Sequence, residues 1–499
     1  METKILSLSI PAEVSHVTET LKKAHFKAFL VGGCVRDILL NKEPRDWDVT
    51  TDATPGEIIK LFEHTFYENK YGTVGVVNET TTNEKLKVIE VTPFRTESTY
   101  TDKRRPDAVT FSKNIEDDLK RRDFTINAIA LNIEPDGASF TGNVTDLFGG
   151  LKDLSNGIIK TVGSPDERLS EDALRIMRAV RLSAELDFRI EKETLEALRV
   201  HAPLLAHIAK ERIRDEFVRI IMSDTPMNAL ILSHELEILP FIAPELEEGV
   251  GVTQNQAHAY DVWEHLLRTV QHSADKKYGL EIRLTALFHD IGKPNTRRFS
   301  RETNQYTFYG HEVVGAKMTE KILKRLNFPT KTIELVVKLV RWHMFFSDTE
   351  QITLSAVRRM VANVGKDHIW DLMNVRICDR IGTGRPKENP YRLRKYKAMV
   401  EEALRDPVSV GMLKINGSRI MEVAKMAPNP KIGFILHALL EEVLENPKLN
   451  TAEYLEGKAV ELAVLDEKAL KALGEEGKER KAQAEEEEVS KIRGKHGVQ

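Results

Sequence analysis

Two aspartates placed two positions apart, in the stretch RDWDVTT, are the first residues whose spacing suggests chemistry. Asp46 and Asp48 flank Trp47, and on an extended strand residues i and i+2 point to the same face. We therefore expect the two carboxylates to converge. Such a pair repels itself without a cation, and hard oxygen ligands suit Mg²⁺, which keeps several waters and is completed by substrate phosphates. The pair predicts a magnesium site for a phosphate-bearing substrate.

A glycine turn just upstream adds an anion-binding element. Gly32 and Gly33 follow the apolar run FKAFLV and precede CVRDILL, which has helical spacing, so the segment predicts a strand, a tight turn and a helix. Glycines let the backbone approach an anion, and the helix N-terminus offers free N–H donors with Arg36 one turn further on. The basic run at residues 120–122, which ends in Arg122, suits phosphate clamping. A plain turn beside a surface Asp-x-Asp pair is the alternative, and the combination favours a site for a magnesium-bound triphosphate.

A second group of residues with chemical potential lies in the middle of the chain. Six of the fifteen histidines fall between residues 258 and 343. A single histidine on an apolar helical segment is usually a structural residue, and we interpret His258 and His272 in that way. The remaining pattern is ordered along the chain as His265, His289-Asp290, His311, His343 and Asp379.

The elements that must position these groups divide the chain in two. DWDVTT, VGVVNE and KVIEVTPF resemble strands, which predicts a small mixed sheet up to about residue 145. From SPDERLSEDALRIMRAVRLSAEL onward apolar residues recur at helical spacing almost to the end. After Tyr454 the chain has no aromatic residue and becomes densely charged, which indicates a solvated helix or disorder.

Composition excludes several classes of protein. With 499 residues and 41% hydrophobic content the chain can bury several cores, and it has no run of apolar residues long enough to span a membrane. Its two cysteines cannot build a disulfide framework. The net charge of only -4 means that nucleic-acid binding requires local basic patches. We expect a cytoplasmic protein.

Four motifs in order resemble the class II tRNA nucleotidyltransferases, which include CCA-adding enzymes and bacterial poly(A) polymerases with a polymerase-beta-like head. They are GGCVRD, RDWDVTTDATP, RRDFTINAIA and SEDALRIMRAVR, within residues 28–240. The resemblance implies that Asp46 and Asp48 are the catalytic metal ligands. It also implies that nucleotide is bound by Gly33, Arg36, Arg122, Asp172, Arg175, Arg178 and Arg181.

By the same resemblance, Asp172 and Arg175 select the nucleotide without a nucleic-acid template. We expect them to be i, i+3 neighbours on one helix, where a carboxylate and a guanidinium can share a plane. A carboxylate accepts from the exocyclic amine of C or A and arginine donates to ring acceptors, so G and U present the wrong pattern. Asp172 and Arg181 would lie half a turn apart around the helix axis and cannot share one contact surface. An ordinary salt-bridged helix is the alternative.

The pattern FRTE..Y...R.P within TPFRTESTYTDKRRPDAVTF resembles the loop of enzymes that add all three nucleotides, and the chain lacks the GRRF-type segment of poly(A) polymerases. Glu90 is either a third acidic group near the metals or a solvent-facing strand residue. Candidate RNA-binding patches are KERIRDEFVR and residues 385–397; the second is equally consistent with a plain amphipathic helix.

The histidine pattern resembles the HD superfamily of metal-dependent phosphohydrolases over residues 255–382. This resemblance implies that one divalent transition metal, such as Mn²⁺, Ni²⁺ or Co²⁺, is held by His265, His289, Asp290 and Asp379, with an open position for water. His311 and His343 would hold a second metal or a phosphate.

The predicted fold class is α+β, with a nucleotidyltransferase head followed by mostly helical parts. We divide the chain into a catalytic head (1–148), a helical neck and body for nucleotide selection and RNA binding (149–250), an HD domain (251–384), a helical tail for tRNA binding (385–465) and a charged tail (466–499).

The predicted function is addition of CCA to tRNA 3′ ends from CTP and ATP with Mg²⁺, together with HD phosphohydrolase activity. One alternative is a poly(A) polymerase, or a partial enzyme that adds only CC or only A. Another is an HD phosphohydrolase whose head senses nucleotides, and a third is a non-catalytic RNA-binding protein. The intact pair of Asp46 and Asp48 argues against the last two.

Overall fold

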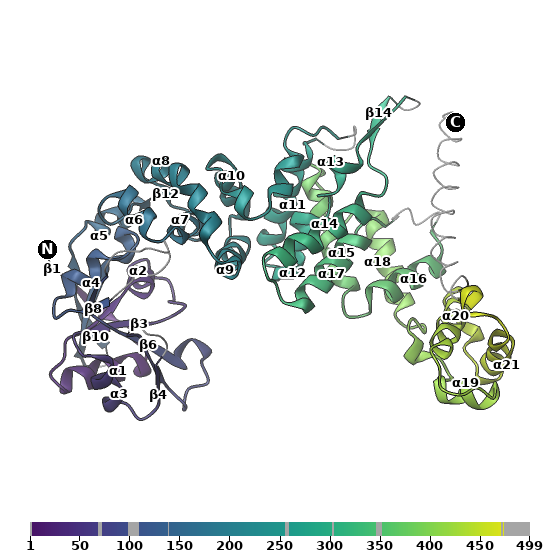
Figure 1. The fold of residues 1–499 in the computed structure, drawn as a ribbon, viewed down its shortest axis with the longest axis horizontal. Helices are drawn as coiled ribbons and strands as arrows, with labels where there is room; N and C mark the ends of the chain where they lie inside the picture. The colour runs from purple at the N-terminus through teal and green to yellow at the C-terminus, as the bar shows by residue number, and fades with distance from the viewer. Residues whose placement is uncertain are drawn as a thin grey trace. The chain divides into compact units, whose positions relative to one another are not determined.

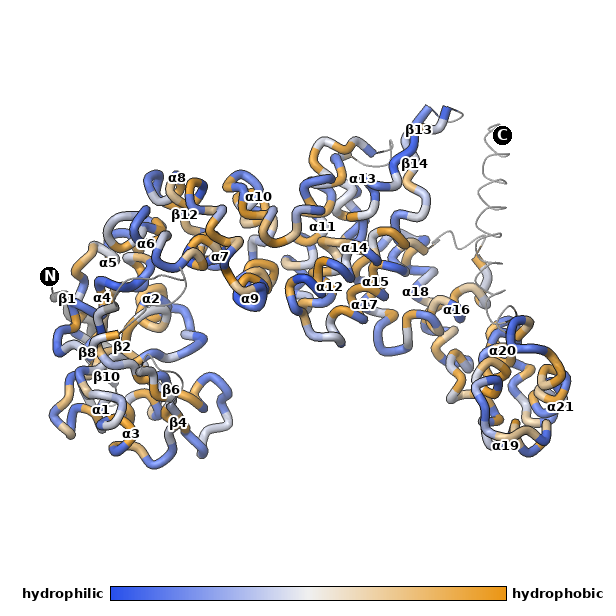
Figure 2. The backbone as a smooth tube through the Cα atoms, in the orientation of Figure 1, coloured by the Kyte–Doolittle hydropathy of each residue, from blue (hydrophilic) through white to orange (hydrophobic). Residues whose placement is uncertain are grey.

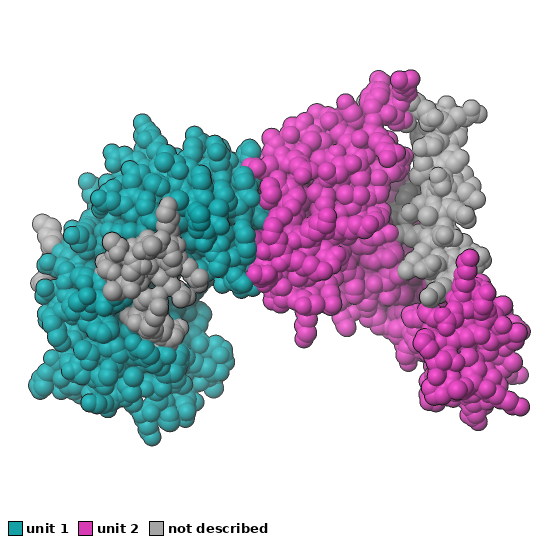
Figure 3. Space-filling model, in the orientation of Figure 1, with its two compact units in different colours: residues 1–243 teal, residues 244–499 magenta. Residues whose placement is uncertain are grey.

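A computed structural model describes residues 2–67, 72–97, 109–137, 139–254, 259–301, 304–345, 352–470 and 473. The chain forms two compact units, residues 1–243 and 244–499 (Figure 3). None of the described helices combines the length and the apolar character needed to cross a membrane. Most of the charged tail, His258 and residues 98–108 of the loop expected to distinguish family members lie outside the described residues.

A mixed sheet of eight strands forms the N-terminal head of the first unit (Figure 1). Its order is β1 (Glu2–Leu8), β10 (Ser139–Asp146), β9 (Ile129–Asp136), β2 (Ala28–Val31), β3 (Asp48–Thr51), β6 (Val88–Pro93), β5 (Val74–Val77) and β4 (Thr65–Tyr67). β3 and β6 are parallel, and the other neighbours are antiparallel. The predicted mixed sheet is confirmed, but it is larger than expected because β1 pairs with β10 from the far end of the head.

Short helices complete the head. They are α1 (Ala12–Lys23), α2 (Gly33–Leu39), α3 (Pro55–Leu61), α4 (Ile115–Lys120) and α5 (Gly150–Asn156), with a separate hairpin of β7 (Arg95–Glu97) and β8 (Val109–Phe111). Val14, Val17 and Leu21 of α1 are fully buried against apolar strand residues such as Leu30 and Val49. The i, i+3, i+4 spacing on α1 and the alternation on the strands bury one face of each. β2 ends just before Gly32 and the antiparallel β3 begins at Asp48, so the glycine turn and this aspartate lie at one edge of the sheet.

The rest of the first unit is helical, as the periodicity predicts. It contains α6 (Pro165–Glu171), α7 (Leu174–Leu186), α8 (Lys192–His201), α9 (Lys210–Ile221) and α10 (Pro226–Glu235), and a two-residue parallel pair of β11 (Ile158–Ile159) and β12 (Arg189–Ile190). The apolar side of α7 is buried at Ile176, Met177 and Val180.

The described part of the second unit is helical apart from one hairpin. Its elements are α11 (Val262–Asp275), α12 (Leu280–Phe288), α13 (Lys293–Thr296), β13 (Arg298–Ser300), β14 (Gln305–Thr307), α14 (His311–Arg325), α15 (Thr330–Trp342), α16 (Leu354–Val364), α17 (Ile369–Gly382), α18 (Tyr391–Ala403), α19 (Gly417–Val423), α20 (Lys431–Glu445) and α21 (Ala452–Ala463). Apolar and polar residues alternate along these helices (Figure 2). One core joins α15 and α16 to the C-terminal helices, with Leu339, Val361, Tyr396 and Leu439 fully buried.

Candidate functional site

The glycine turn and the two aspartates meet at one point in the head. Gly32, with φ 81°, precedes α2, and a β-carbon added there would lie 3.1 Å from Arg122 Nη1 and 3.2 Å from Asp48 Oδ2. A β-carbon added at Gly33 would lie 3.6 Å from Arg36 Nη2 and 3.8 Å from Asp46 Oδ1. Residues far apart in the sequence therefore surround a turn that only glycine leaves open.

The electrostatics of this point fit a cation. Burial together with the charge of Asp46 raises the pKa of Asp48 to about 6, although Arg122 and Arg178 oppose the shift. A buried carboxyl whose pKa is raised by a neighbouring carboxylate is expected at a hard-cation site without its ion. Glu90 pairs with Asp48 in the parallel register of β3 and β6 and is exposed. Glu90 is therefore a third carboxylate, on the strand next to Asp48. A role for Glu90 in binding the metal stays a prediction.

The arginines beside the turn are held by partners that the sequence reasoning did not single out. Arg36 donates to Asp37 Oδ1 at 2.9 and 2.7 Å and to Asn127 Oδ1 at 2.8 Å. Arg122 donates to the buried Asp118 Oδ2 at 3.3 and 2.9 Å. Two of these three partners, Asp118 and Asn127, lie in NIEDDLKRRDFTIN, and the third, Asp37, is the chain neighbour of Arg36. These hydrogen bonds fix the guanidinium groups beside the turn.

One expectation about nucleotide selection is corrected. Asp172 and Arg175 are not i, i+3 neighbours on one helix, because α6 ends at Glu171 and α7 begins at Leu174, with Asp172 extended at φ -133° and ψ 103°. The Asp172 carboxylate accepts from the Leu174 N–H at 3.1 Å. This local hydrogen bond competes with helix continuation, as is typical of aspartate.

In the structure, the two predicted selection residues bond to neighbouring protein groups. Arg212 donates to Asp172 at 3.4 and 3.1 Å. Arg175 is 8% exposed and donates to Glu171 Oε2 at 2.6 Å and to the Arg121 carbonyl at 3.1 Å. Arg168 also bonds to Glu171, at 2.8 Å. For a nucleotide to hydrogen-bond to Asp172 or Arg175, these hydrogen bonds within the protein would have to break.

Arg178 and Arg181 occupy different environments on α7. Arg178 donates through Nε to Asp123 Oδ2 at 2.7 Å, and this ion pair holds the pKa of the Asp123 carboxyl well below its usual range despite burial. Arg181 is 4% exposed and donates to Glu216 at 3.0 and 2.8 Å. Its guanidinium therefore lies in the α7–α9 contact, which does not support the predicted nucleotide contact.

Some residues of each predicted RNA patch are engaged within the chain. On α9, Arg219 pairs with Glu185 at 3.0 Å and Arg214 pairs with Asp215 at 2.8 Å. In residues 385–397, Tyr396 is fully buried and stacks on Phe345 with ring centroids 4.8 Å apart. This supports the amphipathic-helix interpretation for that part of the second patch.

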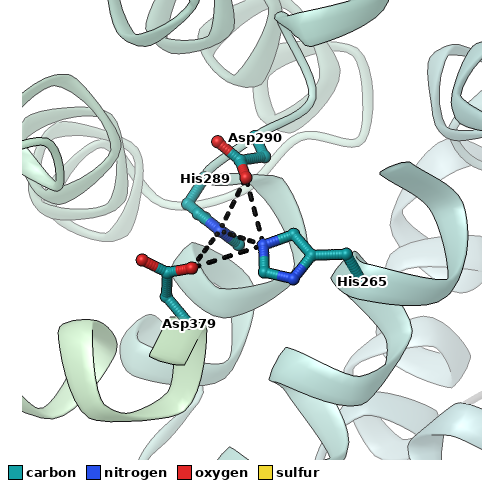
Figure 4. A group of neighbouring side chains, drawn as sticks. All are labelled: His265, His289, Asp290 and Asp379. Carbon is teal, nitrogen blue, oxygen red and sulfur yellow. Dashed lines mark hydrogen bonds and ion pairs between the residues drawn. The ribbon is translucent and has the colours of Figure 1, made fainter. Parts of the chain in front are cut away.

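The histidine pattern converges on a buried cluster in the second unit (Figure 4). His265 lies on α11, His289 and Asp290 follow α12, and Asp379 lies on α17. His265 Nε2 is 3.0 Å from His289 Nε2, 3.1 Å from Asp290 Oδ2 and 3.4 Å from Asp379 Oδ1. One ligand atom of each residue lies within 4.8 Å of the others. The four residues can hold a metal ion.

A second group shares Asp290. Its other oxygen, Oδ1, is 3.1 Å from His311 Nε2 and 3.4 Å from His343 Nε2. The Nδ1 atoms of His289, His311 and His343 lie 2.9, 2.7 and 2.7 Å from backbone carbonyl oxygens. Donation from Nδ1 sets the tautomer that presents Nε2 as a metal ligand. Asp290 is therefore placed to bridge two ligand groups.

The charges in the cluster are strongly coupled. Burial alone would lower the pKa of His289, but Asp290 and Asp379 raise it to about 10. Burial lowers the pKa of His343 to about 4 although Asp290 opposes this. A proton on His289 compensates the buried carboxylates in the same way as a cation would, and neutral imidazole with carboxylate is a donor set that suits transition metals.

Glycines that the motif analysis did not consider bring the cluster together. A β-carbon at Gly382 on α17 would lie 2.1 Å from Thr269 Oγ1 and 3.1 Å from the His265 carbonyl oxygen on α11. A β-carbon at Gly292 would lie 2.4 Å from the His311 carbonyl oxygen. These close approaches are possible only without a side chain, and they place Asp379 and His311 beside the His-Asp pair.

Comparisons with known proteins agree with this architecture. The chain matches the poly A polymerase head domain at residues 28–160, the probable RNA and SrmB-binding site of polymerase A at residues 187–249, and the HD domain at residues 262–367. It is therefore a chain with a poly(A) polymerase-type head followed by an HD domain.

Individual relatives are more specific than the domain families. CCA-adding enzymes of Leuconostoc mesenteroides and Enterococcus faecalis are 42% and 43% identical to it over 264 and 248 residues. These matches cover 52% and 49% of this chain, and only 62% and 58% of the relatives. The crystal structure of the Bacillus stearothermophilus CCA-adding enzyme in complex with CTP superposes with a TM-score of 0.65 at 26% identity, covering 91% of this chain and 98% of that one. The chain is thus similar to CCA-adding enzymes in sequence over about half of its length and in fold over most of it.

Proposed function

We propose that this protein adds CCA to the 3′ end of tRNA from CTP and ATP, without a template. The observation that carries the proposal is the meeting of Asp46 and Asp48 with the glycine turn and with Arg36 and Arg122. The similarity to a CCA-adding enzyme crystallised with CTP supports it.

The residues of the head account for the main requirements of nucleotidyl transfer. Asp46 and Asp48 would hold Mg²⁺, which when bound supplies charge stabilisation for the attacking and leaving oxygens. The backbone at Gly32 and Gly33 lets the triphosphate approach, and Arg122, whose Nη1 faces the turn, neutralises phosphate charge. The tRNA 3′-hydroxyl would lose its proton to solvent, its oxygen would bond to the α-phosphorus, and the bond from that phosphorus to the pyrophosphate leaving group would break. Positioning and charge provide the rate enhancement.

The test supplies the protein with tRNA transcripts that lack one, two or all three terminal nucleotides. CTP, ATP, GTP and UTP are offered singly and together, and the 3′ ends are sequenced. We expect addition to stop once CCA is complete. Asp46→Asn and Asp48→Asn should add nothing, whereas Asp136→Asn at an exposed strand end should behave as wild type. Long adenosine tails would identify a poly(A) polymerase, and products ending at CC or extended only by A would identify a partial enzyme.

The HD cluster supports a second proposed activity, a metal-dependent phosphohydrolase. His265, His289, Asp290 and Asp379 would hold a transition metal such as Mn²⁺, Ni²⁺ or Co²⁺, which when bound activates water. The chain's own part is to present Nε2 atoms and carboxylates at fixed positions and to exclude bulk water, since all four residues are buried. Water would bond to phosphorus, the phosphorus–oxygen ester bond would break, and the leaving oxygen would take the proton.

This activity is tested by reconstituting the protein with each metal and measuring bound metal together with hydrolysis of bis(p-nitrophenyl) phosphate and of 2′,3′-cyclic nucleotides. The variant combining His289→Ala with Asp290→Ala should lose bound transition metal and hydrolysis while CCA addition survives, because Asp46 and Asp48 lie in the other unit. Reconstituted wild-type protein without bound metal would refute the proposal, as would loss of CCA addition in the folded variant.

A further inference from the structure

A short hairpin stands apart from the helices of the second unit. β13 (Arg298–Ser300) and β14 (Gln305–Thr307) form a separate two-stranded sheet, and Figure 1 shows it projecting beyond the ends of α13 and α14. Phe299 pairs with Tyr306 in the antiparallel register, and their rings meet edge to face with centroids 5.4 Å apart. An isolated hairpin of this length buries little apolar surface. Packing in a hydrophobic core therefore does not explain why it carries aromatic residues.

The surface of the hairpin combines cations with exposed aromatic rings. Arg298 and Arg301 are exposed, and Phe299 and Tyr309 are 53% and 65% exposed. The guanidinium of Arg297 lies 3.6 Å from the centroid of the Tyr306 ring. In the sequence, residues 297–310 contain three arginines and one acidic residue, Glu302. Arginines interleaved with exposed rings suit single-stranded nucleic acid, whose phosphates pair with the cations while its bases stack on the rings.

Both ends of the hairpin lead into the metal cluster. On the C-terminal side, the Phe308 carbonyl oxygen lies 2.7 Å from His311 Nδ1. On the N-terminal side, α13 begins at Lys293, whose Nζ is 2.6 Å from Asp290 Oδ2 and 5.6 Å from the centroid of the Phe308 ring. The hairpin thus lies between Asp290 and His311, two residues of the cluster, so RNA bound to the hairpin would be held by the segment that carries them.

We propose that the β13–β14 hairpin binds single-stranded RNA and presents its phosphate-bearing end to the HD cluster. The inference rests on the proposed phosphohydrolase activity and deepens it, because it makes an RNA end, not a free nucleotide, the substrate. Recognition is by backbone charge and stacking, so it is independent of base sequence.

The test uses full-length protein reconstituted with Mn²⁺ and two variants. Phe299→Ala with Tyr309→Ala removes the two most exposed rings of the hairpin. Lys317→Ala with Lys331→Ala, at exposed positions of the same unit, is the matched control. Each is assayed on a short single-stranded RNA ending in a 2′,3′-cyclic phosphate and on bis(p-nitrophenyl) phosphate, and the RNA is photo-crosslinked to map its contacts.

The aromatic variant should lose about tenfold or more in kcat/KM on the RNA, since base stacking on such rings contributes on the order of tenfold per base. Its rate on bis(p-nitrophenyl) phosphate should not change, and the control should match wild type on both substrates. Equal RNA hydrolysis by the aromatic variant, or crosslinks that avoid residues 297–309, would overturn the inference. If wild-type protein hydrolyses neither substrate, the phosphohydrolase proposal fails, and the crosslinks alone decide whether the hairpin binds RNA.

Discussion

Replacing Asp48 by asparagine should abolish nucleotide addition and at the same time stabilise the metal-free protein. Burial and the charge of Asp46 raise the pKa of Asp48 from 3.8 to about 6. The folded chain therefore ionises this carboxyl less readily than the unfolded chain. A pKa difference of about 2 corresponds to about 3 kcal/mol of unfolding free energy near neutral pH. Asparagine has nearly the same shape and does not carry this cost.

The pH dependence of the stability difference follows from the direction of the shift. Below pH 3.8 the Asp48 carboxyl is protonated in both states, so its raised pKa costs nothing. The cost grows as the pH rises to about 6 and is constant above that value. The gain in stability of Asp48→Asn over wild type should therefore be full near neutral pH and should fade as the pH decreases.

Thermal unfolding in EDTA measures this effect. The probe is the emission of the buried Trp47, in a background whose other three tryptophans are replaced by phenylalanine. Asp48→Asn should raise the Tm by on the order of 5–10 °C near neutral pH. Mg²⁺ should raise the Tm of wild type but not of the variant, because only the native site binds the ion. Asp136→Asn should leave the Tm unchanged. A variant that melts at or below the wild-type temperature in EDTA would refute the reasoning.

Three further changes test separate parts of the molecule. Gly32→Ala should lower both stability and nucleotide addition, because it introduces a β-carbon at φ 81° within 3.2 Å of Asp48 Oδ2; normal addition would show that the turn tolerates a side chain. Arg175→Ala should relax discrimination against GTP and UTP, as a lost base contact costs about 1–3 kcal/mol of selectivity; competition assays that show unchanged preference would place selection elsewhere. Arg376→Ala should weaken transition-metal binding about 10–100-fold, since Arg376 holds Asp379 Oδ2 at 2.5 Å. Elemental analysis that finds unchanged metal content after dialysis would contradict this role.

Features set by short stretches of chain were predictable from the sequence. The strand, glycine turn and helix around Gly33 depend on neighbouring residues and are found as predicted. The two aspartates lie beside this turn, but only Asp48 is on a strand, because β3 begins there and Asp46 precedes it. The order of histidines and aspartates from His265 to Asp379 resembles the HD pattern, and this resemblance predicted the cluster that the structure shows. The mostly helical character after the head follows from the same local signal.

Tertiary structure decided what depends on partners distant in the sequence. The sheet gained β1 because it pairs with β10, more than a hundred residues away along the chain. The pairing of Asp172 with Arg212 and the burial of Arg181 against Glu216 follow from contacts with α9. The cluster closes only where Gly382 lets α17 approach α11. The periodicity of a segment predicts which of its faces is apolar. Which other segment covers that face depends on packing between parts of the chain that are far apart in the sequence.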